Sequence, residues 1–173
     1  MGEELKNRTP ARPIESVLTQ ARLRHLNQTE TVVVGPESPV REVCVKMQET
    51  RTGGVLVVGP DGRLLGIFTE RDYLDKLALP VSRDRLHVDL SSPVKKLMTP
   101  SPRALSPGQT LGDAIRLMTE GGYRHIPLVE EDGKVFGLVS AGDLVMFIAE
   151  HFPTEVYNLP PRLHQRIRTL DGG

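Results

Sequence analysis

Apolar residues recur with a helical spacing in two stretches of the chain. In each stretch, four of them follow the pattern i, i+3, i+4 and i+7, which places them on one face of an α-helix. These residues are Val40, Val43, Cys44 and Met47 in the first stretch and Leu111, Ala114, Ile115 and Met118 in the second. The pattern predicts two amphipathic helices.

Two short apolar runs follow each helix, and an Asp-Gly pair separates them. The runs are 55–58 and 64–68 around Asp61-Gly62, and 126–129 and 135–139 around Asp132-Gly133. Short apolar runs on both sides of an Asp-Gly pair predict a β-hairpin. A second helix is expected to start at Thr69 or Ser140, and a short strand is expected at 31–34 and at 103–105. The apolar residues of the second helix are Tyr73, Leu74 and Leu77 in the first stretch and Leu144, Val145 and Ile148 in the second.

These elements recur because the chain contains one unit twice. Positions 71 residues apart match without a gap from Val34 to Leu77, and the matches include turn residues as well as apolar ones. Gly66 aligns with Gly137, for example, and Asp72 aligns with Asp143. We therefore predict an α+β fold of two βαββα repeats in which each repeat helps to bury the sheet of the other.

The duplication divides the chain into four parts. The first repeat occupies residues 26–88 and the second occupies residues 93–150. Residues 1–25 form a polar segment and a short helix, and residues 151–173 form a C-terminal tail.

Composition narrows the possible functions. The 22 basic side chains balance the 22 acidic ones, so no net charge attracts nucleic acid, and no apolar run approaches the length of a membrane span. We therefore expect neither a nucleic-acid nor a membrane partner. The single cysteine, Cys44, falls on a predicted apolar face and is interpreted as a core residue, which suits a reducing cytosol and a cytoplasmic location. No His/Cys cluster has metal-ligand spacing, and no metal site is expected.

Each second helix opens with a hydroxyl residue followed three positions later by an aspartate. Thr69 and Asp72 form one such pair, and Ser140 and Asp143 form the other. One interpretation is a capping box, in which both side chains bond backbone amides at the helix start. The other is a ligand site, because a helix start suits a phosphate and a carboxylate can accept both hydroxyls of a ribose. Both roles can coexist.

Four motifs of the chain resemble the CBS domain, and the whole resembles a stand-alone CBS pair, or Bateman module. They are GIFTERD at 66–72, VKKLMTPSPRALSP at 94–107, GGYRHIPLVEEDGKVFGLVS at 121–140 and GLVSAGD at 137–143, which overlaps the end of the third. The resemblance implies tandem CBS domains in pseudo-two-fold symmetry, which often pair into a disc-like homodimer. It also implies clefts that bind adenosine-containing ligands: AMP, ADP, ATP, NAD or S-adenosylmethionine.

The same resemblance implies the ligand-binding residues. They are Thr69, Arg71, Asp72, Thr99, Arg103, Arg124, His125, Ile126, Pro127, Ser140 and Asp143. The two repeats differ at these places, since Gly53 and Gly54 stand opposite Arg124 and His125. We therefore expect one site built from both repeats, with Arg71, Arg124 and His125 around a phosphate.

The function expected is that of a non-catalytic regulatory module that senses an adenosine nucleotide. The nucleotide is a regulatory ligand, and no cofactor is expected. The module would act on an unidentified regulated protein. The alternative is a scaffold that dimerises or binds a protein without any ligand. An enzyme is not expected, because no nucleophile–base pair, metal cluster or Walker-type glycine loop is present and no catalytic residue can be assigned.

Overall fold

A computed structural model describes residues 14–26, 30–78 and 89–153 of the chain. The first part of the chain contains α1 (Ile14–Gln20) and a 3-10 turn, η1 (Leu23–His25). The elements of repeat one are β1 (Val33–Val34), α2 (Val40–Thr50), β2 (Gly54–Val58), β3 (Leu64–Thr69), α3 (Glu70–Tyr73) and a π-helical turn, η2 (Leu74–Ala78). A second 3-10 turn, η3 (Val94–Lys96), and the elements of repeat two follow: β4 (Thr99–Pro100), α4 (Leu111–Gly121), β5 (His125–Val129), β6 (Val135–Ser140) and α5 (Ala141–His151).

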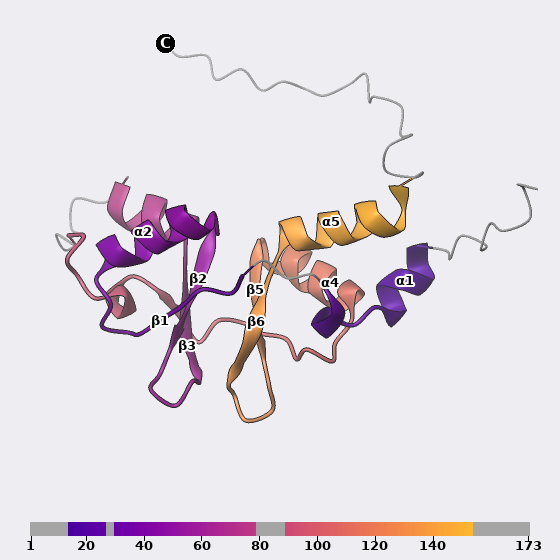
Figure 1. Ribbon diagram of the computed structural model, residues 1–173, viewed down its shortest axis with the longest axis horizontal. Helices are drawn as coiled ribbons and strands as arrows, with labels where there is room; N and C mark the ends of the chain where they lie inside the picture. Colours follow the sequence, from indigo (N-terminus) through magenta and orange to yellow (C-terminus); the bar gives the residue numbers. More distant parts are fainter. Residues whose placement is uncertain (1–13, 27–29, 79–88, 154–173) are drawn as a thin grey trace, which may run out of the picture.

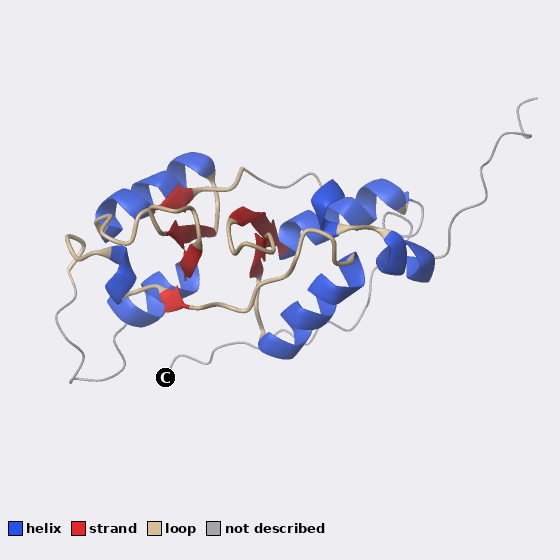
Figure 2. Ribbon diagram, turned by 90° about the horizontal axis from the view of Figure 1, so that it is seen from below, coloured by secondary structure: helices blue, strands red, loops and turns tan. Residues whose placement is uncertain are grey.

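The duplicated architecture is confirmed. The hairpin β2–β3 of repeat one and the hairpin β5–β6 of repeat two lie side by side at the centre of the molecule, with helices outside them (Figures 1 and 2). In both hairpins the glycine of the Asp-Gly pair has a positive φ, 78° at Gly62 and 82° at Gly133, a conformation that glycine adopts without strain. The turns of the two hairpins also bond each other: Leu64 N–H donates to Gly133 C=O and Val135 N–H donates to Gly62 C=O, both at 3.2 Å.

A short segment at the start of each repeat, here called its leading segment, packs on the core of the other repeat. The leading segments are residues 23–26 for repeat one and 94–97 for repeat two. Leu23 and Leu26 are buried in the core of repeat two, together with α4 and β5. Val94 and Leu97 occupy the matching places in the core of repeat one. Backbone bonds secure both crossings, because Leu111 N–H donates to Ala21 C=O and Val40 N–H donates to Ser92 C=O. The two cores therefore depend on each other.

The expected strand at 103–105 is reduced to a single bridge from Leu105 to Leu128. The strand that forms instead is β4, which pairs antiparallel with β3 of repeat one. Two prolines, Pro100 and Pro102, interrupt this segment, and proline has no amide with which to extend a ladder. Residues 98–103 of repeat two, here called the strap, thus run along β3 of repeat one before the chain continues to α4.

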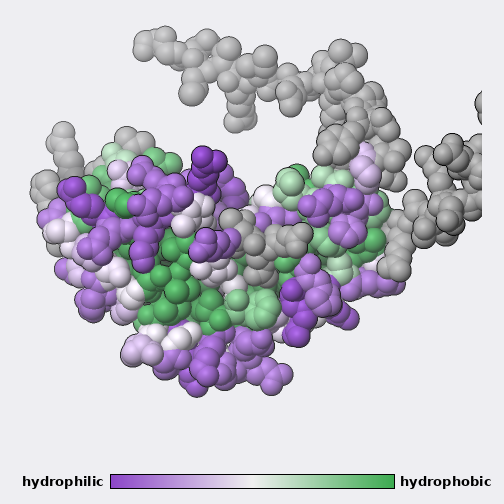
Figure 3. Space-filling model, viewed as in Figure 1, coloured by the Kyte–Doolittle hydropathy of each residue, from purple (hydrophilic) through white to green (hydrophobic). Residues whose placement is uncertain are grey.

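The second helices of the two repeats differ in regularity. In repeat two, α5 is a continuous α-helix of 11 residues, whereas in repeat one the helix changes to a π turn after Tyr73. Side chains expected on the apolar faces also point outward: Leu74 is 51% exposed and Val145 is 63% exposed. Figure 3 shows a further apolar area over the central strands, surrounded by hydrophilic side chains. Among the described residues, none of the helices has the length and hydropathy needed to cross a membrane.

Candidate functional site

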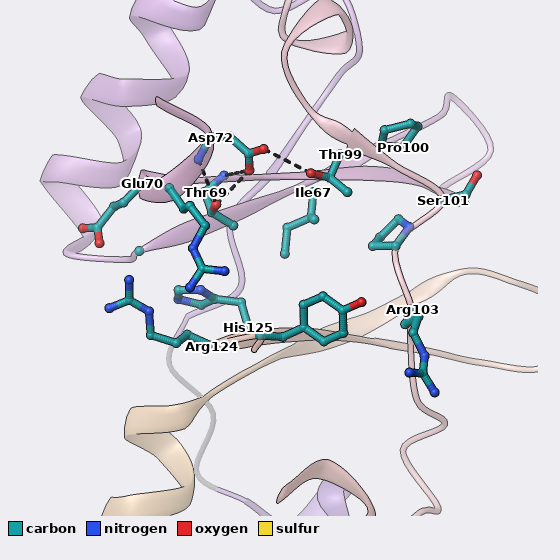
Figure 4. A pocket seen from close by; sticks show the side chains of 14 residues that line it. Ile67, Thr69, Glu70, Asp72, Thr99, Pro100, Ser101, Arg103, Arg124 and His125 are labelled. Atoms are coloured by element: carbon teal, nitrogen blue, oxygen red, sulfur yellow. Dashed lines mark hydrogen bonds between the residues drawn. The ribbon is translucent and has the colours of Figure 1, made fainter. Parts of the chain in front are cut away.

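A cleft of about 330 Å³ opens between the two repeats, at the end of the hairpins that lies away from their turns. Repeat one, the strap and the start of β5 all contribute to it (Figure 4). It brings together seven of the residues predicted from the sequence: Thr69, Arg71, Asp72, Thr99, Arg103, Arg124 and His125. The cleft is therefore built from both repeats, with side chains suited to a polar, anionic ligand.

Thr69 and Asp72 form the predicted capping box. The Asp72 amide donates to Thr69 Oγ1 at 3.3 Å, and Asp72 Oδ2 accepts from the Thr69 amide at 2.9 Å and from its hydroxyl at 2.7 Å. The Glu70 amide donates to the Gly53 carbonyl. Two of the first three helical amides are thus already bonded, so recognition of an anion here falls mainly on side chains.

Three arginines, Arg71, Arg103 and Arg124, supply positive charge to the cleft, against the acids Glu70 and Asp72. Arg124 and His125 extend from the start of β5 toward the helix start of repeat one (Figure 4). Arg71 reaches across from repeat one and donates to the Gly122 carbonyl at 3.1 Å. A guanidinium binds phosphate through two parallel hydrogen bonds, which favours a phosphorylated ligand in this part of the cleft.

His125 fits against repeat one because Gly53 has no side chain. A Cβ at position 53 would lie 2.9 Å from His125 Cε1 and 3.0 Å from Nε2, closer than side-chain carbons approach. Any larger residue at position 53 would push the imidazole out of its place. Gly53 of repeat one therefore makes room for His125 of repeat two.

Burial lowers the pKa of His125 below its ordinary value of 6.5, and Arg124 lowers it further, although Glu70 and Asp143 raise it. The folded protein therefore binds this proton less readily than the unfolded chain. Between pH 7.5 and 5.5 the unfolded state gains the proton first, so the free energy of unfolding should fall as the pH falls. We expect His125→Asn to lose less stability over this range than the wild type in denaturant titrations without ligand. Equal losses would contradict the assignment.

The strap forms the opposite wall of the cleft. It lies so close to β3 that a Cβ at Gly66 would be 2.4 Å from Met98 Sδ and 2.9 Å from the Thr99 carbonyl oxygen, so only glycine fits there. Ser101, between the two prolines, has a φ of 45°, a left-handed conformation that serine seldom adopts. The strap is therefore held in one path along the cleft.

Four of the predicted residues lie elsewhere. Ile126 and Pro127 are buried on β5, and Ile126 belongs to the core of repeat two. Ser140 and Asp143 cap α5 in the same way that Thr69 and Asp72 cap α3. The symmetry of the repeats relates Ser140 and Asp143 to a second position, equivalent to the cleft. At that position Gly142 stands in place of Arg71. Gly53 and Gly54 stand there in place of Arg124 and His125. The residue equivalent to Thr99 at the second position is Gln28, which lies outside the described residues.

Sequence reasoning missed several residues of the cleft. Glu70, Tyr123 and Ile67 line it, and Ile67 adds to the apolar surface that Pro100 and Pro102 of the strap present. Glu70 follows Thr69 directly, and Tyr123 directly precedes Arg124, so adjacency to predicted residues was the available signal. No group of three or more potential metal-ligating side chains occurs in the part of the chain that the structure describes.

Two βαββα repeats with a polar cleft between them define a tandem-repeat module. The family model for the CBS domain matches residues 23–79 and 94–150, so the chain belongs to the CBS domain family as a tandem pair. The family assignment made from the sequence motifs is therefore confirmed.

Individual relatives agree with this assignment. The "Uncharacterized 17.7 kDa protein in bps2 3'region" of Acidianus ambivalens is 32% identical over 116 residues, which cover 67% of this chain and 66% of that protein. The solved CBS-domain containing protein ATU1752 from Agrobacterium tumefaciens has a TM-score of 0.58 at 32% identity, covering 69% of this chain and 90% of that one. The structure of CBSX2 in complex with AMP has a TM-score of 0.65 at 24% identity, covering 75% of this chain and 97% of that one, a likeness of fold alone.

Proposed function

We propose that this CBS pair is a non-catalytic regulatory module that binds one anionic adenine nucleotide in the cleft between its repeats. The single observation that carries the proposal is the gathering of Arg71, Arg124 and His125 at one end of a cleft that also contains Asp72 and Thr99. The basic end suits phosphates, the hydroxyl-accepting carboxylate suits a ribose, and the apolar strap side suits a base. The structure of CBSX2 in complex with AMP is consistent with this proposal.

Phosphate number should decide affinity in such a site. Three arginines face the cleft against two acids, so each added phosphate gains more attraction than repulsion. We therefore place ATP first, then ADP, AMP and adenosine, with the cationic S-adenosylmethionine below the nucleotides. NAD belongs between AMP and adenosine in this order, because its diphosphate is a diester and its nicotinamide ring is cationic.

Isothermal titration calorimetry tests the proposal. We expect one ATP per chain, with an affinity about fivefold lower in Asp72→Ala and unchanged in Asp143→Ala. Each substitution removes the acid of a capping box, and Asp72→Ala also removes the acceptor of the Lys76 and Thr99 bonds. Absence of binding by every adenosine ligand, or an effect confined to Asp143→Ala, would contradict the proposal.

A second candidate function is a ligand-free scaffold. Apolar side chains exposed on the helices favour an interface: Val45 is 45% exposed, Val145 is 63% exposed and Met146 is 60% exposed. We propose that these helices pair two copies of the chain, whether or not the cleft binds a nucleotide. The resulting homodimer would be cytoplasmic and would act on a regulated protein. The scaffold hypothesis differs from the nucleotide-binding hypothesis in one outcome: it predicts no heat of nucleotide binding in the calorimetric titration.

A further inference from the structure

The carboxylate of Asp72 already accepts as many hydrogen bonds as it can hold. Its Oδ2 atom receives the Thr69 amide at 2.9 Å and the Thr69 hydroxyl at 2.7 Å. Its Oδ1 atom receives Lys76 Nζ at 2.6 Å and Thr99 Oγ1 at 3.1 Å. A carboxylate offers about four lone-pair positions. Ligand hydroxyls can therefore reach Asp72 only by displacing a donor that is present now.

The donors on Oδ1 are the ones that can leave. The Thr69 amide is fixed by the backbone, and the Thr69 hydroxyl is held in place by the Asp72 amide. Thr99 makes the longest of the four bonds, through a hydroxyl that can rotate. Lys76 makes the shortest, and its long side chain is 31% exposed, so solvent is open to it. Its departure costs a charge-assisted bond, about twice as strong as a neutral one.

Lys76 also donates a hydrogen bond to the backbone of Leu97, the residue directly before the strap. Its Nζ atom donates to the Leu97 carbonyl at 2.5 Å, while Leu97 itself is buried in the core of repeat one. The lysine lies on the π turn of residues 74–78, where the helix departs from α geometry. π turns of this kind are frequent at functional sites. One ammonium thus joins the helix, the carboxylate and the segment before the strap.

Repeat two lacks this arrangement. The residue 71 positions after Lys76 is Phe147, which has no ammonium to offer to Asp143 and stacks instead on His151, with 4.0 Å between ring centroids. The helix that carries Phe147 stays α-helical to His151. The lysine is therefore a feature of repeat one, whose helix start lines the cleft, and is not required by the repeated fold.

We propose that Lys76 is a specificity-determining residue that competes with the hydroxyls of a vicinal diol for Asp72 Oδ1. The proposal rests on the proposed function and adds to it: the lysine lowers the preference of the cleft for ribose over a sugar without hydroxyls. When a ribonucleotide enters, its diol takes Oδ1 and the ammonium leaves both Asp72 and the Leu97 carbonyl. A ligand without the diol leaves the lysine where it is.

The test compares ATP with 2′,3′-dideoxy-ATP in calorimetric titrations of the full chain. Lys76→Met keeps the length of the side chain and removes its charge, so the diol no longer competes. We expect the ratio of the two affinities to rise about tenfold over the wild type, through tighter ATP binding and unchanged dideoxy-ATP binding. Lys76→Arg keeps a cation and should leave the ratio near that of the wild type.

An unchanged ratio in Lys76→Met overturns the proposal, and so does a loss of affinity confined to ATP, which would mean that the lysine supports the diol site. Binding of neither ligand to any variant would instead overturn the proposed function together with it. A second measurement on the wild type does not depend on a variant that folds. In side-chain ¹⁵N spectra the Lys76 ammonium signal should shift on addition of ATP and not on addition of dideoxy-ATP; equal shifts with both count against the competition.

Discussion

Replacing Arg71 and Arg124 together with alanine is expected to weaken ATP binding about a hundredfold, because each guanidinium contributes about tenfold through charge-assisted bonds to phosphate. Both side chains line the cleft, one from each repeat. The loss should be smaller for AMP and absent for adenosine. Calorimetric titration of the three ligands measures this difference directly.

A control pair of arginines separates local contacts from net charge. Arg63 and Arg116 lie outside the residues that line the cleft, and their side chains are 61% and 65% exposed. Their double replacement with alanine changes the net charge of the protein by the same amount, and we expect it to leave ATP affinity within about twofold, since exposed charges are screened by salt. Equal losses in both double variants would mean that general electrostatic attraction, and no phosphate site, holds the ligand.

The crossed leading segments are expected to make the two repeats unfold together. Leu23→Ala and Leu97→Ala each remove a buried leucine from the core of the opposite repeat, and each should lower the free energy of unfolding by about 3 kcal/mol. Because each core depends on the leading segment of the other repeat, a calorimetric scan should show a single transition in both variants, at a temperature about 10 °C lower.

Ile14→Ala provides the comparison for these variants. Ile14 lies on α1 and is 48% exposed, so we expect its replacement to change stability by less than about 0.5 kcal/mol. Two separate transitions, with each leucine variant lowering only one of them, would show that the repeats are independent and that the crossing contributes little.

The local elements of the fold were predictable because their signals are local. Hairpin formation depends on neighbouring apolar runs and an Asp-Gly turn, and both hairpins form with glycine in the left-handed conformation. The crossing was not predicted, although Leu23 and Leu26 match Val94 and Leu97 at the same offset of 71 residues. The register shows that these residues are equivalent, but which repeat they cover depends on packing between distant parts of the chain.

The candidate site divides in the same way. The capping boxes follow from spacing alone, and the structure contains both of them. The meeting of Arg71, Arg124 and His125 was predicted from the asymmetry of the repeats, since repeat two supplies Arg124 and His125 and repeat one supplies Arg71. The bond from Lys76 to Asp72 lies within one helix, but its significance depends on Thr99 and Leu97, which reach the same place only through the fold.

The bonds between the two hairpin turns join the repeats at the end away from the cleft. Leu64 and Val135 tie the turns together at one end of the hairpins, and the cleft lies at the other end. The two repeats are therefore joined at the turn end of their hairpins, and the opposite end borders the cleft. A ligand that spreads Arg71 from Arg124 would rotate the hairpins about the turns with little change there, and the displacement would be largest at the outer helices.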